Sequence, residues 1–142
     1  ATKIHTVPLI SPTAPAGLPA DFVATGIPVP AIERIRIFSD RQWEEFVLEW
    51  VDSLRDQYGL VERCGGAGDM GRDVIAISKD DVAIWDNYQC KHYKNALTPG
   101  NIWVELGKLS FYTQRGDYSY PRSYLFVAPQ GAGTSLSNLL KI

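Results

Sequence analysis

Three short strand-like segments follow one another in the middle of the chain, and only turns separate them. They cover residues 60–64, 72–78 and about 82–91, and the third is rich in β-branched and aromatic residues. Connections this short join antiparallel neighbours, because a parallel pair needs a crossover of a dozen or more residues. The pattern therefore predicts an antiparallel meander, around which the rest of the chain must be arranged.

Helical periodicity flanks the meander on both sides. Ser39 and Gln42 have the spacing of a capping box, and the apolar residues that follow predict a helix over residues 40–57. A break at residues 98–101 starts a second predicted helix. The apolar stripe of the first helix consists of Trp43, Phe46, Val47, Trp50, Val51 and Leu54, and that of the second of Ile102, Trp103, Leu106, Leu109 and Phe111 or Tyr112.

Residues 123–128 form a nearly continuous hydrophobic run, which is typical of a buried central strand. Since the helix before it is a crossover from the third strand, the last strand should lie parallel to its neighbour in a mixed sheet with helices on its faces. Residues 134–140 have the character of a helix inside which the chain stops, which suggests a domain of a longer protein. The expected class is α/β, with the order α-β-β-β-α-β-α.

The first part of the chain has a different composition. Residues 1–30 contain six prolines and no sustained period, so we expect an irregular Pro-rich arm. Residues 34–38 alternate polar and apolar, which predicts a short edge strand. The expected organisation is an arm with an edge strand at 1–38 and one domain at 39–142.

Composition favours a globular domain. A chain of 142 residues with 45% hydrophobic residues can fold around one core. No apolar run approaches the ~18 residues of a membrane helix and no secretory signal is visible, so we expect a cytoplasmic protein with no membrane partner. Cys64 and Cys90 are too few for a disulfide framework and lie in no zinc-binding pattern.

The net charge of −2 is unevenly distributed. Residues 1–86 hold 8 Lys/Arg against 14 Asp/Glu, whereas residues 87–142 hold 6 against 2. Acidic residues that hold a hard cation, beside lysines that meet phosphate, suit a metal-dependent enzyme acting on nucleic acid. Unequal solvated faces explain the same asymmetry.

Three polar residues are predicted to converge at one end of the meander. Asp73 begins the second strand, and Gln89 and Lys91 end the strand that pairs with it, on one face. Mg²⁺ takes oxygen ligands from one or two carboxylates, waters and substrate phosphate, so Asp73 and Gln89 are candidate ligands. Lys91 would orient or deprotonate an attacking water, or stabilise charge on phosphoryl oxygens.

These residues belong to a longer pattern. The run G-x-G-D-x-G-R-D-V at 66–74, followed sixteen residues after Asp73 by Q-x-K at 89–91, resembles the PD-(D/E)xK nuclease superfamily, in particular its Mrr-like branch with glutamine in place of the second acid. In that branch an aromatic residue and a glutamate open the preceding helix, and Trp43 and Glu44 fall on this pattern. The resemblance covers about residues 40–128.

The resemblance implies a restriction endonuclease-like core and a Mg²⁺-dependent phosphodiesterase that cuts DNA, with Mn²⁺ as a substitute. It implies that Asp73, Gln89 and Lys91 are the motif residues and Glu44 the helix acid near the metal. It also implies the effector domain of a bacterial restriction or anti-phage defence protein, which forms a homo-oligomer and is fused to or associated with a sensor or NTPase module.

Other interpretations stay open at this stage. Lys94 and Tyr93 after the motif, and Arg72 before Asp73, are candidate substrate-binding residues, although a solvated loop explains Lys94 and Tyr93 nearly as well. Three further interpretations concern neighbouring residues: Glu45 or Glu49 in place of Glu44, Asp69 as a turn residue, and His92 as a packed or hydrogen-bonded side chain. The glycine-rich turn lacks the Gly-Lys-Ser/Thr ending of a phosphate-binding loop. A non-cutting binding module on the same fold and a nuclease for RNA are the alternative functions.

Overall fold

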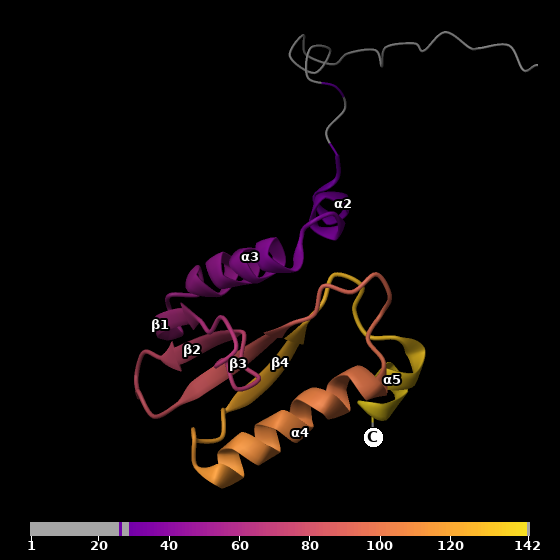
Figure 1. Ribbon diagram of the computed structural model, residues 1–142. Helices are drawn as coiled ribbons and strands as arrows, with labels where there is room; N and C mark the ends of the chain where they lie inside the picture. The colour runs from indigo at the N-terminus through magenta and orange to yellow at the C-terminus, as the bar shows by residue number, and fades with distance from the viewer. Residues whose placement is uncertain (1–25, 27–28, 142) are drawn as a thin grey trace, which may run out of the picture. The chain divides into compact units, whose positions relative to one another are not determined.

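The computed structural model describes Gly26 and residues 29–141. The chain divides into two units, residues 1–30 and 31–142, and the described helices and strands lie in the second. Most of the expected Pro-rich arm therefore lies outside the described residues. The mixed α/β class is confirmed, because the second unit holds four helices and a mixed four-stranded sheet (Figure 1).

The sheet has the strand order β1-β2-β3-β4. Its first three strands are antiparallel neighbours, as their short connections predict, and β4 is parallel to β3 after the crossover through α4. The elements are β1 (Tyr58–Arg63), β2 (Val74–Ser78), β3 (Trp85–Cys90), α4 (Pro99–Arg115) and β4 (Ser123–Val127).

Helix α3 (Asp40–Asp52) covers one face of the sheet (Figure 1). The predicted capping box is present, with Ser39 and Gln42 each bonded to the other's backbone N–H. The helix ends at Asp52 and not at residue 57, since Ser53 caps it. The strand predicted at residues 60–64 begins earlier, at Tyr58, whose side chain is buried. The main core combines three α3 residues with strand residues: Trp43, Val47, Val51, Tyr58, Val74, Ala76 and Tyr88.

Val47 tests how much this core contributes, because its side chain is 0% exposed. We expect Val47→Ala to lower the free energy of unfolding by roughly 1.5–3 kcal/mol, through the lost methyl groups and the cavity they leave. Val104→Ala is the matched control, since Val104 lies on α4 and is 60% exposed. Urea unfolding measures both; an equal effect of the two variants would contradict the assigned core.

Helices α4 and α5 (Thr134–Leu139) lie on the other face (Figure 1). Leu97, Ile102 and Leu136 form a second buried cluster there. The predicted second helix is confirmed, with Thr98 as its N-cap. Helix α5 ends at Leu139 with Leu140 as its C-cap, so the expectation of a helix cut by the chain end is wrong.

The edge strand predicted at residues 34–38 is also wrong, because helix α2 (Ala31–Arg36) occupies this segment. Alternation of polar and apolar residues over only five positions is weak evidence for a strand, and contacts that form only in a helix outweigh it. Glu33 pairs with Arg36 one turn later at 2.6 Å, and Ile35 packs against the main core.

Strand β4 is hydrophobic for a different reason from the one expected. Among the described residues it lies at an edge of the sheet and its residues are partly exposed, so the buried central position is wrong. An apolar cluster nevertheless lies against each of its faces. Val127 packs against the main core beneath α3, whereas Phe126 and Ala128 pack against the second cluster beneath α4 and α5. Two separate clusters therefore require apolar residues on alternate positions of one edge strand.

Candidate active site

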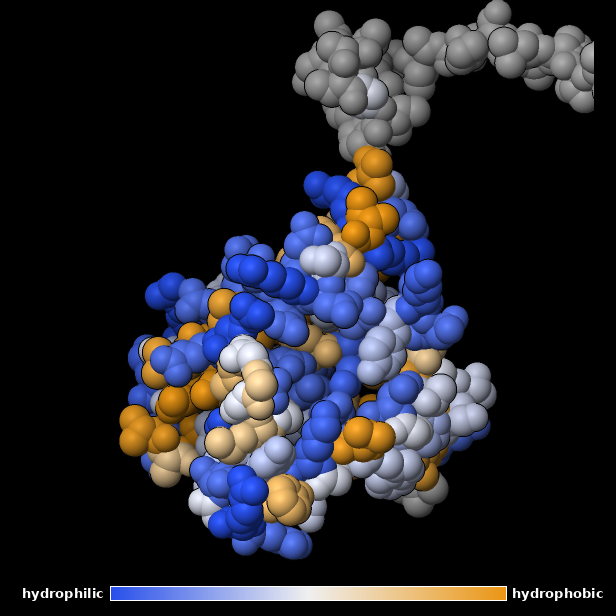
Figure 2. Space-filling view, viewed as in Figure 1, coloured by the Kyte–Doolittle hydropathy of each residue, from blue (hydrophilic) through white to orange (hydrophobic). Residues whose placement is uncertain are grey.

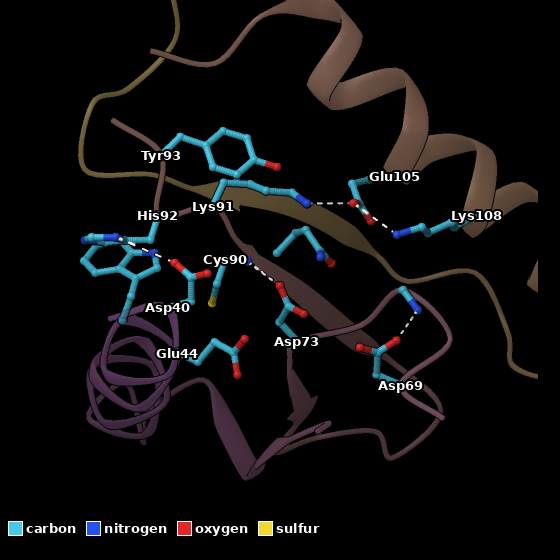
Figure 3. A pocket seen from close by; sticks show the side chains of 13 residues that line it. Asp40, Glu44, Asp69, Asp73, Cys90, Lys91, His92, Tyr93, Glu105 and Lys108 are labelled. Carbon is cyan, nitrogen blue, oxygen red and sulfur yellow. Dashed lines mark hydrogen bonds and ion pairs between the residues drawn. The ribbon is translucent and has the colours of Figure 1, made fainter. Parts of the chain in front are cut away.

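A cavity of ≈280 Å³ lies where β2 begins and β3 ends, and we call it the acidic cavity (Figure 3). Its lining includes Glu44, Asp73, Gln89 and Lys91, so the structure brings the four predicted catalytic residues together. Hydrophilic residues prevail between α3 and α4 on the face seen in Figure 2. The full lining is Asp40, Trp43, Glu44, Asp69, Gly71, Asp73, Gln89, Cys90, Lys91, His92, Tyr93, Glu105 and Lys108.

Strand pairing places Asp73 beside the end of β3. Val74 pairs with Tyr88, so the residue before one lies opposite the residue after the other, Gln89. Asp73 Oδ2 accepts a hydrogen bond from the Cys90 backbone N–H at 2.7 Å. Burial raises the pKa of Asp73 to about 6, although this hydrogen bond opposes the shift. Asp73 is therefore mainly ionised at neutral pH and in a state that a cation would stabilise.

Gln89 is buried in a hydrogen-bond network at the bottom of the cavity. Its Oε1 lies 3.0 Å from the Tyr124 hydroxyl and 3.3 Å from Asn87 Nδ2. The same hydroxyl lies 3.2 Å from the Gly71 carbonyl oxygen, and one proton cannot serve both acceptors. If the Gln89 and Asn87 amides are both turned by half a rotation, Gln89 Nε2 donates to Tyr124 and to Asn87 Oδ1, and the Tyr124 hydroxyl donates to Gly71. The Gln89 carbonyl oxygen is then free for a ligand.

Glu105 is a site residue that the sequence reasoning missed. It lies on α4, is 4% exposed, and its Oε1 accepts a hydrogen bond from Lys91 Nζ at 2.6 Å and another from Lys108 Nζ at 3.3 Å (Figure 3). Its Oε2 is buried and has no hydrogen-bond partner within the described residues. The sequence feature that could have identified Glu105 is its position inside the apolar stripe defined by Ile102 and Leu106, because a charge that is buried there needs a partner.

The buried ion pair fixes the charge state of Lys91. Burial disfavours the ammonium, but the hydrogen bond and the charge of Glu105 outweigh it and raise the pKa of Lys91. Its side chain is 11% exposed. Lys91 is therefore a positioned cation at neutral pH, which suits charge stabilisation better than proton abstraction.

Only one of the three candidate helix acids reaches the acidic cavity. Glu44 lines it and accepts a hydrogen bond from Arg63 on β1 at 2.8 Å. Glu45 instead pairs with Arg41 on the exposed side of α3, and Glu49 is exposed outside the cavity. The choice of Glu44 depends on the rotation of α3, which its apolar residues set by packing on the sheet.

The other acids of the cavity come from its rim. Asp69 Oδ1 accepts a hydrogen bond from Gly71 N at 2.9 Å, which confirms its predicted role in the turn. Asp40 begins α3, with a side chain 90% exposed. Five carboxylates thus line the cavity against two ammonium groups, Lys91 and Lys108.

The three candidate substrate-binding residues lie apart. Tyr93 lines the acidic cavity, and Lys91 Nζ lies 5.8 Å from its ring centroid. Lys94 lines a neighbouring pocket. Arg72 does not line the acidic cavity; its guanidinium stacks on Tyr118, 4.5 Å from the ring centroid.

His92 is hydrogen-bonded, as predicted, with Nε2 at 2.8 Å from the Ile35 carbonyl oxygen. Strand alternation places Cys90 and His92 on the face opposite Gln89 and Lys91. Both nevertheless line the acidic cavity, because it lies at the end of the strands and receives side chains from both faces.

The donor set fits a cation that the substrate helps to bind. Within the described ranges, no group of three or more His, Cys, Asp or Glu residues is placed to hold a metal. Mg²⁺ needs only one or two carboxylates when waters and substrate phosphate complete its shell. Asp73 supplies one carboxylate, whose Oδ1 is free of hydrogen bonds within the described part of the chain, with Gln89 and Glu44 beside it.

Comparison with known proteins gives no further information about the site, so its chemistry is inferred from the geometry above. No family model, no curated protein and no solved structure matches the chain. Among the helices that the structure describes, none has the length and apolar character needed to span a membrane.

Proposed function

We propose that this chain is a Mg²⁺-dependent endonuclease domain that hydrolyses phosphodiester bonds of DNA. The observation that carries the proposal is the meeting of Asp73, Gln89 and Lys91, from two paired strands, with Glu44 from α3 in one cavity. A carboxylate, an amide oxygen and a fixed ammonium are the groups that this chemistry needs at a phosphate.

The charge of the acidic cavity supports a role for a divalent cation. Five carboxylates against two ammonium groups would repel a phosphodiester that enters alone. Mg²⁺ bound there would neutralise this charge, polarise the scissile phosphate and lower the pKa of water. Asp73, Gln89 and Glu44 are the residues that would hold it.

The protein's own groups then have separate roles. Lys91 stays protonated and lies close enough to the cavity to stabilise charge that develops on the phosphoryl oxygens or to orient the attacking water. Glu105 holds the Lys91 ammonium in place. In-line attack of water leaves a 5′-phosphate and a 3′-hydroxyl.

The wider setting is part of the proposal. A restriction endonuclease-like core is supported by the antiparallel strands β1 to β3, the crossover α4 and the parallel strand β4. On this assignment the chain is the effector domain of a bacterial restriction or anti-phage defence protein. It is fused to or associated with a sensor or NTPase module. It acts as a homo-oligomer, since cutting both DNA strands takes two active sites or two successive events.

Incubation of the chain with supercoiled plasmid tests the proposal. We expect nicking with Mg²⁺ or Mn²⁺, little turnover with Ca²⁺, whose looser coordination positions water poorly, and none in excess EDTA. Full activity in EDTA would refute the metal site. Metal-dependent binding of DNA without cleavage would favour a non-cutting module, and faster cleavage of a matched RNA would favour a ribonuclease.

A further inference from the structure

A second pocket of ≈390 Å³ adjoins the acidic cavity, and we call it the side pocket. Asp40, His92 and Tyr93 line both, and Arg36, Phe38 and Lys94 line the side pocket alone. We infer that the side pocket binds one unpaired nucleotide of the DNA strand whose neighbouring phosphate lies in the acidic cavity. This inference rests on the proposed nuclease function and names the form of its substrate.

The charge of the side pocket is opposite in sign to that of the acidic cavity. Lys94 and Arg36 supply two cations to the lining, where Asp40 is the one carboxylate, and Arg36 also pairs with Glu33 on the same helix at 2.6 Å. The two cations come from distant segments, α2 and the residues after β3, yet they face one space. A phosphate that is repelled by the acidic cavity is therefore attracted next to it.

Aromatic surface lies beside these charges. Tyr93 is 42% exposed and lines both spaces, and Phe38 contributes a second ring to the wall of the side pocket. Stacking on aromatic side chains combined with cations along the backbone path is how proteins bind single strands without reading their sequence. Bases of a duplex are stacked on one another, so their faces are available to Tyr93 only when the nucleotide is unpaired.

The wall of the side pocket is held in place before any ligand binds. The His92 Nε2 hydrogen bond to the Ile35 carbonyl oxygen, at 2.8 Å, ties α2 to the end of β3. Ile35 packs on the main core, as does Phe38. The volume also lies in the range of small-molecule sites, about 300–1,000 Å³, which suits a single nucleotide.

Fluorescence anisotropy of a labelled short oligothymidylate, measured on the full chain with Ca²⁺ in place of Mg²⁺ so that turnover is small, tests the inference apart from cleavage. We expect Arg36→Ala and Lys94→Ala each to weaken binding and to lower the salt dependence of log K by about 0.7. Tyr93→Ala should weaken it roughly 5- to 150-fold, while Tyr93→Phe, which keeps the ring, should bind like the wild type. Asp40→Asn should bind more tightly, because it removes the opposing charge.

The controls keep charge and location separate. Arg34→Ala changes the same helix and Lys79→Ala removes an exposed lysine in the β2–β3 turn, and neither residue lines the side pocket. Equal weakening by a control and its partner, or tighter binding of the annealed duplex than of the single strand, would overturn the inference. If the side-pocket variants weaken oligothymidylate binding but the chain does not cut DNA with Mg²⁺, the side pocket is supported and the nuclease function is refuted. Mg²⁺-dependent cleavage at the wild-type rate in all these variants would instead support the nuclease function and refute the side pocket as a nucleotide site.

Discussion

Replacing Asp73 with asparagine is expected to abolish cleavage and to stabilise the fold at neutral pH. The variant removes the one carboxylate placed between β2 and β3 at the cavity, and we expect plasmid nicking with Mg²⁺ to fall on the order of 1,000-fold, about 4 kcal/mol. Asparagine can still accept the hydrogen bond from Cys90 N, so the strand ends stay paired.

The stabilising half of this prediction follows from the raised pKa. Burial moves the pKa of Asp73 from 3.8 to about 6, so the folded state binds a proton more readily than the unfolded state. Stability from this group is therefore present below about pH 4 and is lost as the pH rises to about 6. Asparagine does not ionise, and we expect a gain of roughly 1–2 kcal/mol at pH 7, discounted for the partial exposure of this carboxyl.

Thermal unfolding at several pH values measures this gain, which should raise Tm by a few degrees at pH 7 and disappear below pH 4. Mg²⁺ should raise Tm of the wild type and not of Asp73→Asn, which reports metal binding without any activity assay. Asp56→Asn, an exposed residue after α3, is the control. Two results would show that Asp73 is not the buried metal-site acid. One is nicking by Asp73→Asn at the wild-type rate, and the other is a stability gain over the wild type that is smaller at pH 7 than at pH 4.

Removing Glu105 is expected to damage both stability and catalysis through Lys91. Glu105→Leu leaves the Lys91 ammonium buried without its partner, and breaking a buried pair in this way costs roughly 3–5 kcal/mol. The double variant Lys91→Met with Glu105→Leu buries no charge and should regain most of that stability. The exposed pair of Arg41 and Glu45 is the control, where Glu45→Leu should change stability by only about 0.5 kcal/mol.

Single-turnover cleavage separates the catalytic part of this effect. We expect Lys91→Ala to lose roughly 2–4 kcal/mol of transition-state stabilisation. Glu105→Gln keeps the shape of the side chain and should slow cleavage by roughly 10- to 100-fold, as other orienting partners do. In a Lys91→Ala background the same change should have little further effect. Fully additive losses would show that Glu105 acts independently of Lys91.

The motif and the first helix were accessible to sequence reasoning because short-range rules control them. The period of a strand puts Gln89 and Lys91 on one face, and two tight connections fix which strands pair, so Asp73 had to lie near Gln89. The capping box likewise fixed the start of α3 at Ser39.

Where short patterns competed, the sequence prediction failed. Alternation over residues 34–38 favoured a strand. The segment is instead a helix, in which Ile35 packs on the core and its carbonyl oxygen is hydrogen-bonded to His92. The hydrophobic run at 123–128 predicted a central strand, whereas two clusters on opposite faces explain it at an edge. Such outcomes depend on what covers each face, which no local pattern contains.

The sequence by itself determined the meander, the helices that flank it and the meeting of Asp73, Gln89 and Lys91. Only the tertiary structure decided that Glu105 holds Lys91, that Glu44 lines the cavity whereas Glu45 and Glu49 do not, and that Arg36 and Lys94 share a pocket. The physical reason is that backbone hydrogen bonding and side-chain period act between near neighbours. The rotation of α3 and α4 about their axes and the position of α2 are instead set by burial of apolar surface, which depends on residues from the whole chain.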